Sequence, residues 1–348
     1  SNMGNTYYVF DRGETAKISE CCRLAFKLEK SDLNDAMQPW KMRYSALQNI
    51  TINLPRVAYR AKGNTDTLFK LLAGALELVA KGHEQKKKFI KELLFYGAEG
   101  PLSMLAMKRD GESYLRLWRA TYLVGILGLN EMVQAHLGCE LHEKEDAFKF
   151  GLKVIAFMKL KCEELSKKYN MHFVLEQTPA ESTAYRFAKL DMEHYRKETE
   201  SVVKGNQNTG EIYYTNSTYF NVGKPMNPID RIKDEGIFHP LIEAGALTHV
   251  WLGESKPSKE GIANFVIKTF KNTQNSQIAF SPEFTFCNDC GRTVRGLRET
   301  CPHCNSSNIE GITRITGYFS RISGWNRGKL GELKDRFRSS EHFNAKFL

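Results

Sequence analysis

The hydrophobic positions of this chain fall into short runs typical of buried strands. Runs rich in apolar and β-branched residues end at turn-forming residues and are too short for helices. Such runs predict five strands, at residues 7–10, 50–57, 120–126, 172–176 and 247–252. The second run contains Pro55, which we expect to close that strand.

Between these runs, apolar residues recur at spacings of three and four, as on one face of a helix. This pattern predicts helices at 64–97, 143–169 and 258–271, the first with its N-cap at Thr65 or Asp66. A short helix is expected after Gly128, and the polar segment 199–224 is expected to be mostly loop. Strands that alternate with helices in this way indicate an α/β domain with a mainly parallel sheet or barrel.

The composition narrows the class of protein. The 348 residues, 41% hydrophobic and 26% charged, could form one large α/β domain or about two average ones. No apolar run approaches the roughly 20 residues of a membrane span, and the first residues carry no signal-peptide pattern, so we expect a cytoplasmic protein. The net charge of +10 suits a polyphosphate ligand or a nucleic acid. Its spread along the chain argues against nucleic acid.

Four of the eight cysteines form two CxxC pairs, in which Cys287 pairs with Cys290 and Cys301 with Cys304. Zinc binds four thiolates in a tetrahedron, and two CxxC turns supply the thiolates in pairs. Residues 291–300 between the pairs are enough for a hairpin. We therefore predict a closed, structural zinc site in a small ribbon. A redox or iron–sulfur site is the alternative.

A second candidate site is the segment Thr178-Pro179-Ala180-Glu181-Ser182, between a predicted strand and a helix. Proline suits the first helical turn, and Thr178 could cap that helix. The free amides and positive dipole end of such a helix can bind a phosphate. A capped helix without a ligand is the simpler interpretation of the same residues.

Three other features allow more than one interpretation. Cys22, beside Cys21 and Arg23, is either a thiol activated by a nearby cation or a small buried residue. Asn49 and Asn53 lie in or beside a predicted strand and could simply form turns. Gly317, taken alone, is typical of a turn or a bulge.

In combination, these segments resemble the anaerobic ribonucleoside-triphosphate reductases, the oxygen-sensitive glycyl-radical class. The order and spacing of the motifs agree with that family over almost the whole chain. The motifs are Cys22-Arg23, 51–56, 125–131, 178–182, Asn216-Ser217, the four CxxC cysteines, 314–318 and Gly328-Lys329. With this resemblance, Gly317 becomes a candidate for the radical glycine.

The resemblance implies the C-terminal half of a ten-stranded α/β barrel made of two five-stranded halves. It divides the chain into a half-barrel at 1–280 with a finger loop at about 11–46, a zinc ribbon at 281–310, and a glycyl-radical loop with a basic tail at 311–348. The first half of the barrel and the N-terminal regulatory cone have no counterpart here. We therefore expect a fragment or one half of a split enzyme, a homodimer in the full protein, and exposed apolar surface that promotes association.

The resemblance also implies a mechanism. A separate radical-SAM activase with an iron–sulfur cluster removes a hydrogen atom from the Cα of Gly317. The glycyl radical then takes a hydrogen atom from Cys22, and the resulting thiyl abstracts the 3′ hydrogen of a ribonucleoside triphosphate, so that the 2′ hydroxyl leaves as water. Residues Thr178 to Ser182 would hold the phosphates. Asn53, with Asn49 as the alternative, would bond the ribose hydroxyls.

The reductant implied by the family is formate or a thioredoxin- or glutaredoxin-type dithiol, with a second cysteine supplied by the missing half. Formate-using members carry a methionine shortly before the radical glycine, and this chain has none after Met226. This difference favours a dithiol. The alternative function is a catalytically inactive zinc-ribbon α/β module, which would need neither Cys22 nor Gly317. Glycyl-radical lyases lack the ribbon and the 178–182 motif.

Overall fold

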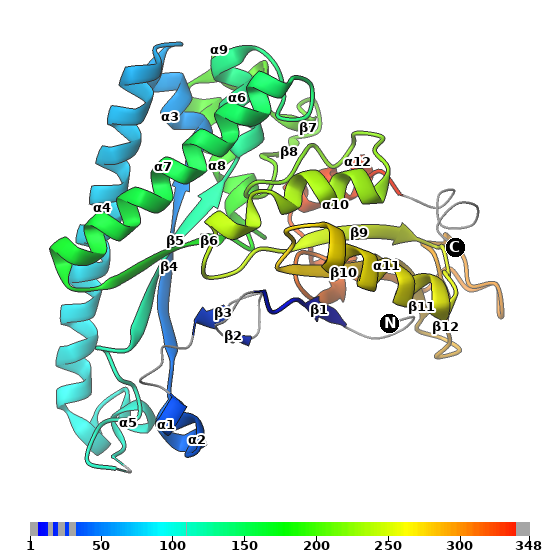
Figure 1. The fold of residues 1–348 in the computed structure, drawn as a ribbon. Helices are drawn as coiled ribbons and strands as arrows, with labels where there is room; N and C mark the ends of the chain where they lie inside the picture. Colours follow the sequence, from blue (N-terminus) through cyan, green and yellow to red (C-terminus); the bar gives the residue numbers. More distant parts are fainter. Residues whose placement is uncertain (1–5, 13–16, 20–24, 28–32, 109, 339–348) are drawn as a thin grey trace.

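The computed structural model describes residues 6–12, 17–19, 25–27, 33–108 and 110–338. Cys21 and Cys22 lie outside the described residues. The described part is built around two long helices, a parallel sheet, a second smaller sheet and a ribbon near the C-terminus (Figure 1). Within that part, no helix is both long and apolar enough to cross a bilayer.

The central sheet holds three parallel strands in the order β4 (Ser45–Asn53), β5 (Ala120–Leu127) and β6 (His172–Gln177). All eight residues of β5 are buried, as expected for a middle strand covered on both faces. Helices α3 (Leu54–Ala61), α4 (Thr65–Phe95), α6 (Leu129–Leu137) and α7 (Glu145–Tyr169) pack in the same hydrophobic cluster as Tyr122, Val124 and Ile126. The alternate residues of β5 therefore face away from these helices.

A second sheet continues the first. Strands β9 (Thr248–Gly253) and β10 (Gln277–Pro282) are parallel, and β1 (Tyr7–Val9) pairs antiparallel with β10. Helices α10 (Pro228–Gly236) and α11 (Lys259–Asn272) contribute to its hydrophobic cluster. The segment before β9 joins the two sheets, because Gly245 forms a parallel bridge with Glu176. The strands thus follow the order β4, β5, β6, β9, β10 and β1, and the described residues form no closed barrel.

The ribbon is an antiparallel sheet in the order β12 (Thr293–Arg295), β11 (Phe284–Cys287), β13 (Ile309–Arg314) and β14 (Phe319–Arg321). Helix α12 (Arg327–Asp335) follows it. The remaining elements are β2 (Lys17–Ser19), β3 (Ala25–Lys27), α1 (Leu33–Ala36), α2 (Pro39–Met42), α5 (Ser103–Ala106), α8 (Thr183–His194), α9 (Arg196–Glu200), β7 (Lys204–Asn206) and β8 (Glu211–Tyr213), with short 3-10 turns at Gly97–Glu99, His239–Leu241 and Ile322–Gly324.

The predicted strands at 120–126 and 172–176 and the helix at 143–169 are confirmed. The predicted strand at 50–57 is wrong after Asn53, because α3 begins at Leu54 with Pro55 in its first turn. The fixed φ of proline suits that position, where no amide hydrogen is needed. The N-cap of α4 is Asn64 instead of Thr65 or Asp66, since the Asn64 side chain accepts a bond from the Thr67 amide at 2.8 Å.

His83 on α4 makes the fold sensitive to pH. Its side chain is fully buried, Nε2 donates to the carbonyl oxygen of Leu123 in β5 at 3.0 Å, and burial lowers its pKa below the usual 6.5. The unfolded chain therefore takes up a proton more readily, and the folded state loses stability as the pH falls below about 6.5. We expect the Tm to fall between about pH 7.5 and about pH 5.5, and to fall less steeply in His83→Gln.

Thermal unfolding followed by circular dichroism would measure this slope. His194→Gln, at an exposed position at the end of α8, is the control and should keep the wild-type slope. A His83→Gln variant with the full wild-type pH dependence would contradict the assignment.

Candidate functional site

Polar side chains gather on the face of β5 that points away from the helices, and Gly125 makes room for them. A Cβ at Gly125 would lie 2.2 Å from Thr178 Oγ1, 2.3 Å from Asn49 Oδ1 and 2.5 Å from Thr51 Oγ1. The Asn49 amide donates to the Glu176 carboxylate, and the two threonine hydroxyls lie 3.0 Å apart. We call Asn49, Thr51, Glu176 and Thr178 the Gly125 cluster.

The Gly125 cluster lies toward the carboxyl ends of three adjacent parallel strands, the edge at which open α/β sheets bind ligands. It combines an amide, a carboxylate and two hydroxyls, so it can both donate to and accept from the hydroxyls of a ligand. Glu176 is only 4% exposed. Glu176 was not predicted from the sequence to be functional, although an acidic residue at the end of a mostly apolar strand is a signal that could have found it.

The two candidate asparagines have different surroundings. Asn49 belongs to the Gly125 cluster. Asn53 caps α3, because its Oδ1 accepts from the Arg56 amide at 3.2 Å, and its Nδ2 donates to the buried Asp191 at 2.9 Å. Asp191 also accepts from Tyr214 at 2.8 Å. Both amides are therefore hydrogen-bonded within the protein, Asn53 to Asp191 and Asn49 to Glu176, and Asn49 is the one that lies beside Gly125.

The segment Thr178 to Ser182 connects β6 with α8, but the predicted capping is wrong. Helix α8 begins at Thr183, so Pro179 does not lie in its first turn, and the N-cap is Ser182, whose side chain makes no capping bond. Thr178 is held instead by Thr51. Ala180 has a φ of +47°, in the left-handed region, where the chain turns between strand and helix.

Glu181, in this same segment, contacts the loop that contains Gly317. One carboxylate oxygen accepts from the Thr316 hydroxyl at 3.1 Å, and the other accepts from the Tyr318 hydroxyl at 3.0 Å. The Glu181 carbonyl oxygen accepts from Asn326 at 2.7 Å. Two segments far apart in sequence, both predicted to be functional, are therefore in direct contact.

Gly317 lies in the hairpin loop between β13 and β14. Arg314 pairs with Phe319 at the ends of these strands, so residues 315–318 form the tip. Arg314 Nη1 donates to the Gly317 carbonyl oxygen at 2.5 Å. Gly317 is buried, and a Cβ at this position would lie 2.7 Å from the hydroxyl oxygen of Tyr7 in β1.

Helix α12 supports the base of the same loop. Arg336 donates to the carbonyl oxygens of Arg314 and Ile315, at 3.0 Å and 3.3 Å. Its charge is balanced by Glu332 at 2.8 Å, and Glu332 also pairs with Lys329 at 2.5 Å. Because both cations stabilise the ionised carboxylate, the pKa of Glu332 stays below its usual value despite full burial. The sequence analysis did not predict this helix.

The four CxxC cysteines meet at one end of the ribbon. Their sulfurs all lie within 4.8 Å of one another, with Cys287 and Cys304 at 3.6 Å and Cys290 and Cys301 at 3.7 Å. A zinc ion with bonds of about 2.3 Å to a tetrahedron of thiolates would separate the sulfurs by about 3.8 Å, so the residues fit the metal. The His303 amide donates to Cys301 and contributes to lowering the pKa of that thiol to about 7.

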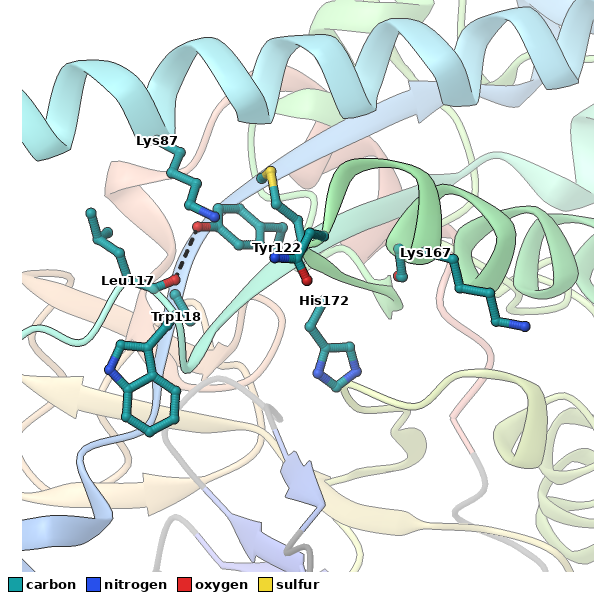
Figure 2. Close-up of a pocket in the computed structure, with 10 residues that line it drawn as sticks. Lys87, Leu117, Trp118, Tyr122, Lys167 and His172 are labelled. Atoms are coloured by element: carbon teal, nitrogen blue, oxygen red, sulfur yellow. Dashed lines mark hydrogen bonds between the residues drawn. The ribbon is translucent and has the colours of Figure 1, made fainter.

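A separate cavity of about 360 Å³ lies at the opposite ends of β5 and β6 (Figure 2). Lys87 points from α4 toward the Tyr122 hydroxyl, which donates to the Leu117 carbonyl oxygen at 3.3 Å. Burial raises the pKa of Tyr122 to about 12. Among the residues that the structure describes, none of those predicted to be functional lines this cavity.

Comparisons with solved structures place this architecture among the anaerobic ribonucleotide reductases. One such structure aligns with 85% of this chain and 45% of its own, with a TM-score of 0.68 and 21% identity. The Thermotoga maritima anaerobic ribonucleotide reductase in complex with dATP and CTP aligns with 83% of this chain and 45% of its own, with a TM-score of 0.65 and 22% identity. At these identities the likeness shows the fold alone.

The sequence comparisons show the family. The model of the anaerobic ribonucleoside-triphosphate reductase family matches residues 1–338, and the chain belongs to this family. The reductase of Escherichia coli (strain K12) is 26% identical over 307 residues, which cover 83% of this chain and 42% of that protein. The reductase of Enterobacteria phage T4 is 24% identical over 197 residues, or 54% of this chain and 31% of that protein. The chain thus spans less than half the length of these relatives.

Gly125→Ala tests whether the Gly125 cluster needs the absence of a side chain. The added methyl group would overlap three polar atoms, so we expect a loss of about 1–3 kcal/mol in the free energy of unfolding. Urea denaturation measures this loss. Gly74→Ala, at an exposed position on α4 with no atom near the new Cβ, is the matched control and should stabilise the helix by about 0.5–1 kcal/mol. Unchanged stability in Gly125→Ala would contradict the packing described here.

A second prediction concerns the metal site. We expect the purified chain to contain one zinc ion, by elemental analysis, and expect Cys304→Ser to lose it, because three thiolates leave the tetrahedron incomplete. Chelation should increase amide hydrogen exchange in β11 and β13, which pair next to Cys287. Cys139→Ser, a buried cysteine outside the cluster, should retain the metal. A zinc-free wild-type chain with an ordered ribbon would exclude the site.

Proposed function

We propose that this chain forms the C-terminal catalytic part of an anaerobic ribonucleoside-triphosphate reductase that reduces ribonucleoside triphosphates by glycyl- and thiyl-radical chemistry. The observation that carries the proposal is the contact between Glu181 and both neighbours of Gly317. It brings the candidate radical residue next to the segment that follows β6 and the Gly125 cluster. A remnant without activity would have no need for this arrangement.

Three regions carry out the proposed function. Residues 1–280 are half of a ten-stranded barrel with a finger loop at about 11–46, residues 281–310 are the zinc ribbon, and residues 311–348 carry the glycyl-radical loop and a basic tail. The order of parallel strands from β4 to β10 supports a five-stranded half-barrel. Strands β13 and β14 extend the ribbon sheet up to and beyond Gly317, so the ribbon and the radical loop share one sheet.

The substrate would lie between α8 and the Gly125 cluster. The free amides in the first turn of α8 would bind the phosphates, with the positive end of the helix dipole directed toward them. Asn49 and Glu176 would bond the ribose hydroxyls, a role first predicted for Asn53. Each hydrogen bond to a ribose hydroxyl would replace a hydrogen bond made within the cluster. Few polar groups would then be left unpaired when the substrate binds, so the free-energy cost would be small.

The radical steps then involve Gly317 and Cys22. Gly317 would lose a Cα hydrogen atom to a radical-SAM activating enzyme that contains an iron–sulfur cluster. It would recover a hydrogen atom from Cys22, and the thiyl would take the 3′ hydrogen of the ribose, after which the 2′ hydroxyl leaves as water. The position of Tyr7 beside Gly317 supports this pairing, because β1 comes shortly before Cys22 in the chain.

The proposal requires further partners. The reductant would be a thioredoxin- or glutaredoxin-type dithiol, with formate as the alternative, and the remaining part of the barrel would complete the enzyme, a cytoplasmic homodimer. Several large apolar side chains near the end of α4 and in the segment up to β5 are exposed, which supports a protein partner. They are Phe95, Tyr96, Met104, Met107, Tyr114 and Trp118.

Electron paramagnetic resonance tests the proposal. After anaerobic activation in the complete assembly, we expect a glycyl doublet, and after admission of air, cleavage of the chain at Gly317. Gly317→Ala should show neither, because a side chain opposes a planar radical stabilised by both amides. Gly324→Ala is the control, since a Cβ there would meet no atom, and it should keep the doublet.

The Tyr7→Phe/Gly317→Ala double variant separates chemistry from steric clash, because it removes the hydroxyl that the new methyl group would contact. It should also lack the doublet. Absence of a doublet from the wild-type chain in the complete assembly would favour the inactive zinc-ribbon module. An unchanged doublet in Gly317→Ala would place the radical elsewhere.

A further inference from the structure

At the tip of the Gly317 hairpin, a single carboxylate spans the glycine. Thr316 and Tyr318 flank Gly317, and each donates its hydroxyl to a different oxygen of Glu181. The two bonds fix the loop on both sides of the Gly317 Cα. Hydrogen bonds to a carboxylate are about twice as strong as neutral ones, so this pair contributes to holding the tip.

Glu181 differs in origin from Arg314 and Arg336, two other residues that bond the loop. Arg314 and Arg336, which bond the carbonyl oxygens of Gly317 and Ile315, belong to the same continuous segment as the hairpin and α12. Glu181 instead belongs to the connection between β6 and α8. It therefore links the tip to the α/β core, and its two bonds must break whenever the tip moves away from that core.

Such a movement is needed if Gly317 is to react with another protein. Gly317 is buried, with Tyr7 packed against the position of a Cβ. An activating enzyme cannot reach its Cα in this conformation. The chain must therefore have an open form of the tip. The energy of the Glu181 bonds sets part of the free-energy difference between the closed and the open form.

We propose that Glu181 is a positioning residue that locks the Gly317 hairpin in its closed place and, by releasing Thr316 and Tyr318, allows an activating protein to reach Gly317. The inference rests on the proposed function for the identity of that protein. The lock itself rests only on the contacts described above. Glu181 thus has a role apart from the phosphate contact predicted from its sequence motif.

Hydrogen exchange of backbone amides, followed by mass spectrometry on the whole chain, tests the lock without radical chemistry. Glu181→Ala removes both acceptors, and we expect exchange at residues 315–318 to increase about tenfold while β5 keeps its wild-type protection. Glu181→Gln keeps one acceptor oxygen, and its amide can donate to the other hydroxyl, so we expect a smaller increase. Glu310→Ala is the matched control, since it removes a carboxylate of β13 that accepts two bonds from Ser323, outside the tip.

A double-mutant comparison locates the effect. Thr316→Val and Tyr318→Phe each remove one donor and should each raise exchange at the tip less than Glu181→Ala does. In the Glu181→Ala background, the same two changes should add nothing further. Full additivity would overturn the lock, as would an equal increase throughout β5 and β13, because that would show a general loss of stability.

The rate of radical formation gives a second readout. We expect Glu181→Ala to acquire the doublet several-fold faster than wild type and to turn over more slowly, since the open tip is easier to activate but worse placed for reaction. Unchanged exchange in Glu181→Ala would overturn the lock, whatever the radical yield. Raised exchange with no doublet in any variant, wild type included, would leave the lock supported and overturn the proposed function.

Discussion

The buried guanidinium of Arg314 holds three segments of the chain together. It is fully buried and donates to the carbonyl oxygens of Phe280 at 3.1 Å, Thr6 at 3.2 Å and Gly317 at 2.5 Å. Its plane lies over the rings of Tyr7 and Phe319. A buried charge costs several kcal/mol unless each donor is satisfied, so β10, β1 and the hairpin must all be in place together.

The two faces of the central sheet differ in polarity, because one packs against apolar helices and the other carries the polar groups of the Gly125 cluster. Alternation along β5 directs Tyr122, Val124 and Ile126 to the helices and leaves Gly125 on the other face. Without a side chain at Gly125, groups from β4 and β6 can meet across the middle strand. The polar groups bond one another, which limits the cost of burying them until a ligand exchanges with them.

The features that could be predicted from sequence are those set by local chemistry. Each CxxC pair forms its own turn, and the runs in β5 and α7 carry their periodicity within one element. Local chemistry could not decide whether Asn49 or Asn53 is the candidate for bonding a ligand, because both are on the same face of β4. Asn53 donates a hydrogen bond to Asp191, a residue far along the chain. The contact of Glu181 with the Gly317 loop likewise depends on packing between distant segments, and the left-handed Ala180 in that connection has no clear signal in sequence.

In the proposed arrangement, the ribbon combines an end fixed by a metal with a tip that Glu181 can release. A tetrahedral metal site at Cys287 would fix the register of this small antiparallel sheet where β11 meets β13. The other end of β13 leads to Gly317, where the bonds from Thr316 and Tyr318 to Glu181 are ones that water can replace. Under the proposed function, the loop holds Gly317 accurately during turnover and presents it to another protein beforehand, and this division is physically favourable for both. The metal would keep the hairpin folded when the tip leaves Glu181, so that opening would cost a few polar contacts instead of the whole sheet.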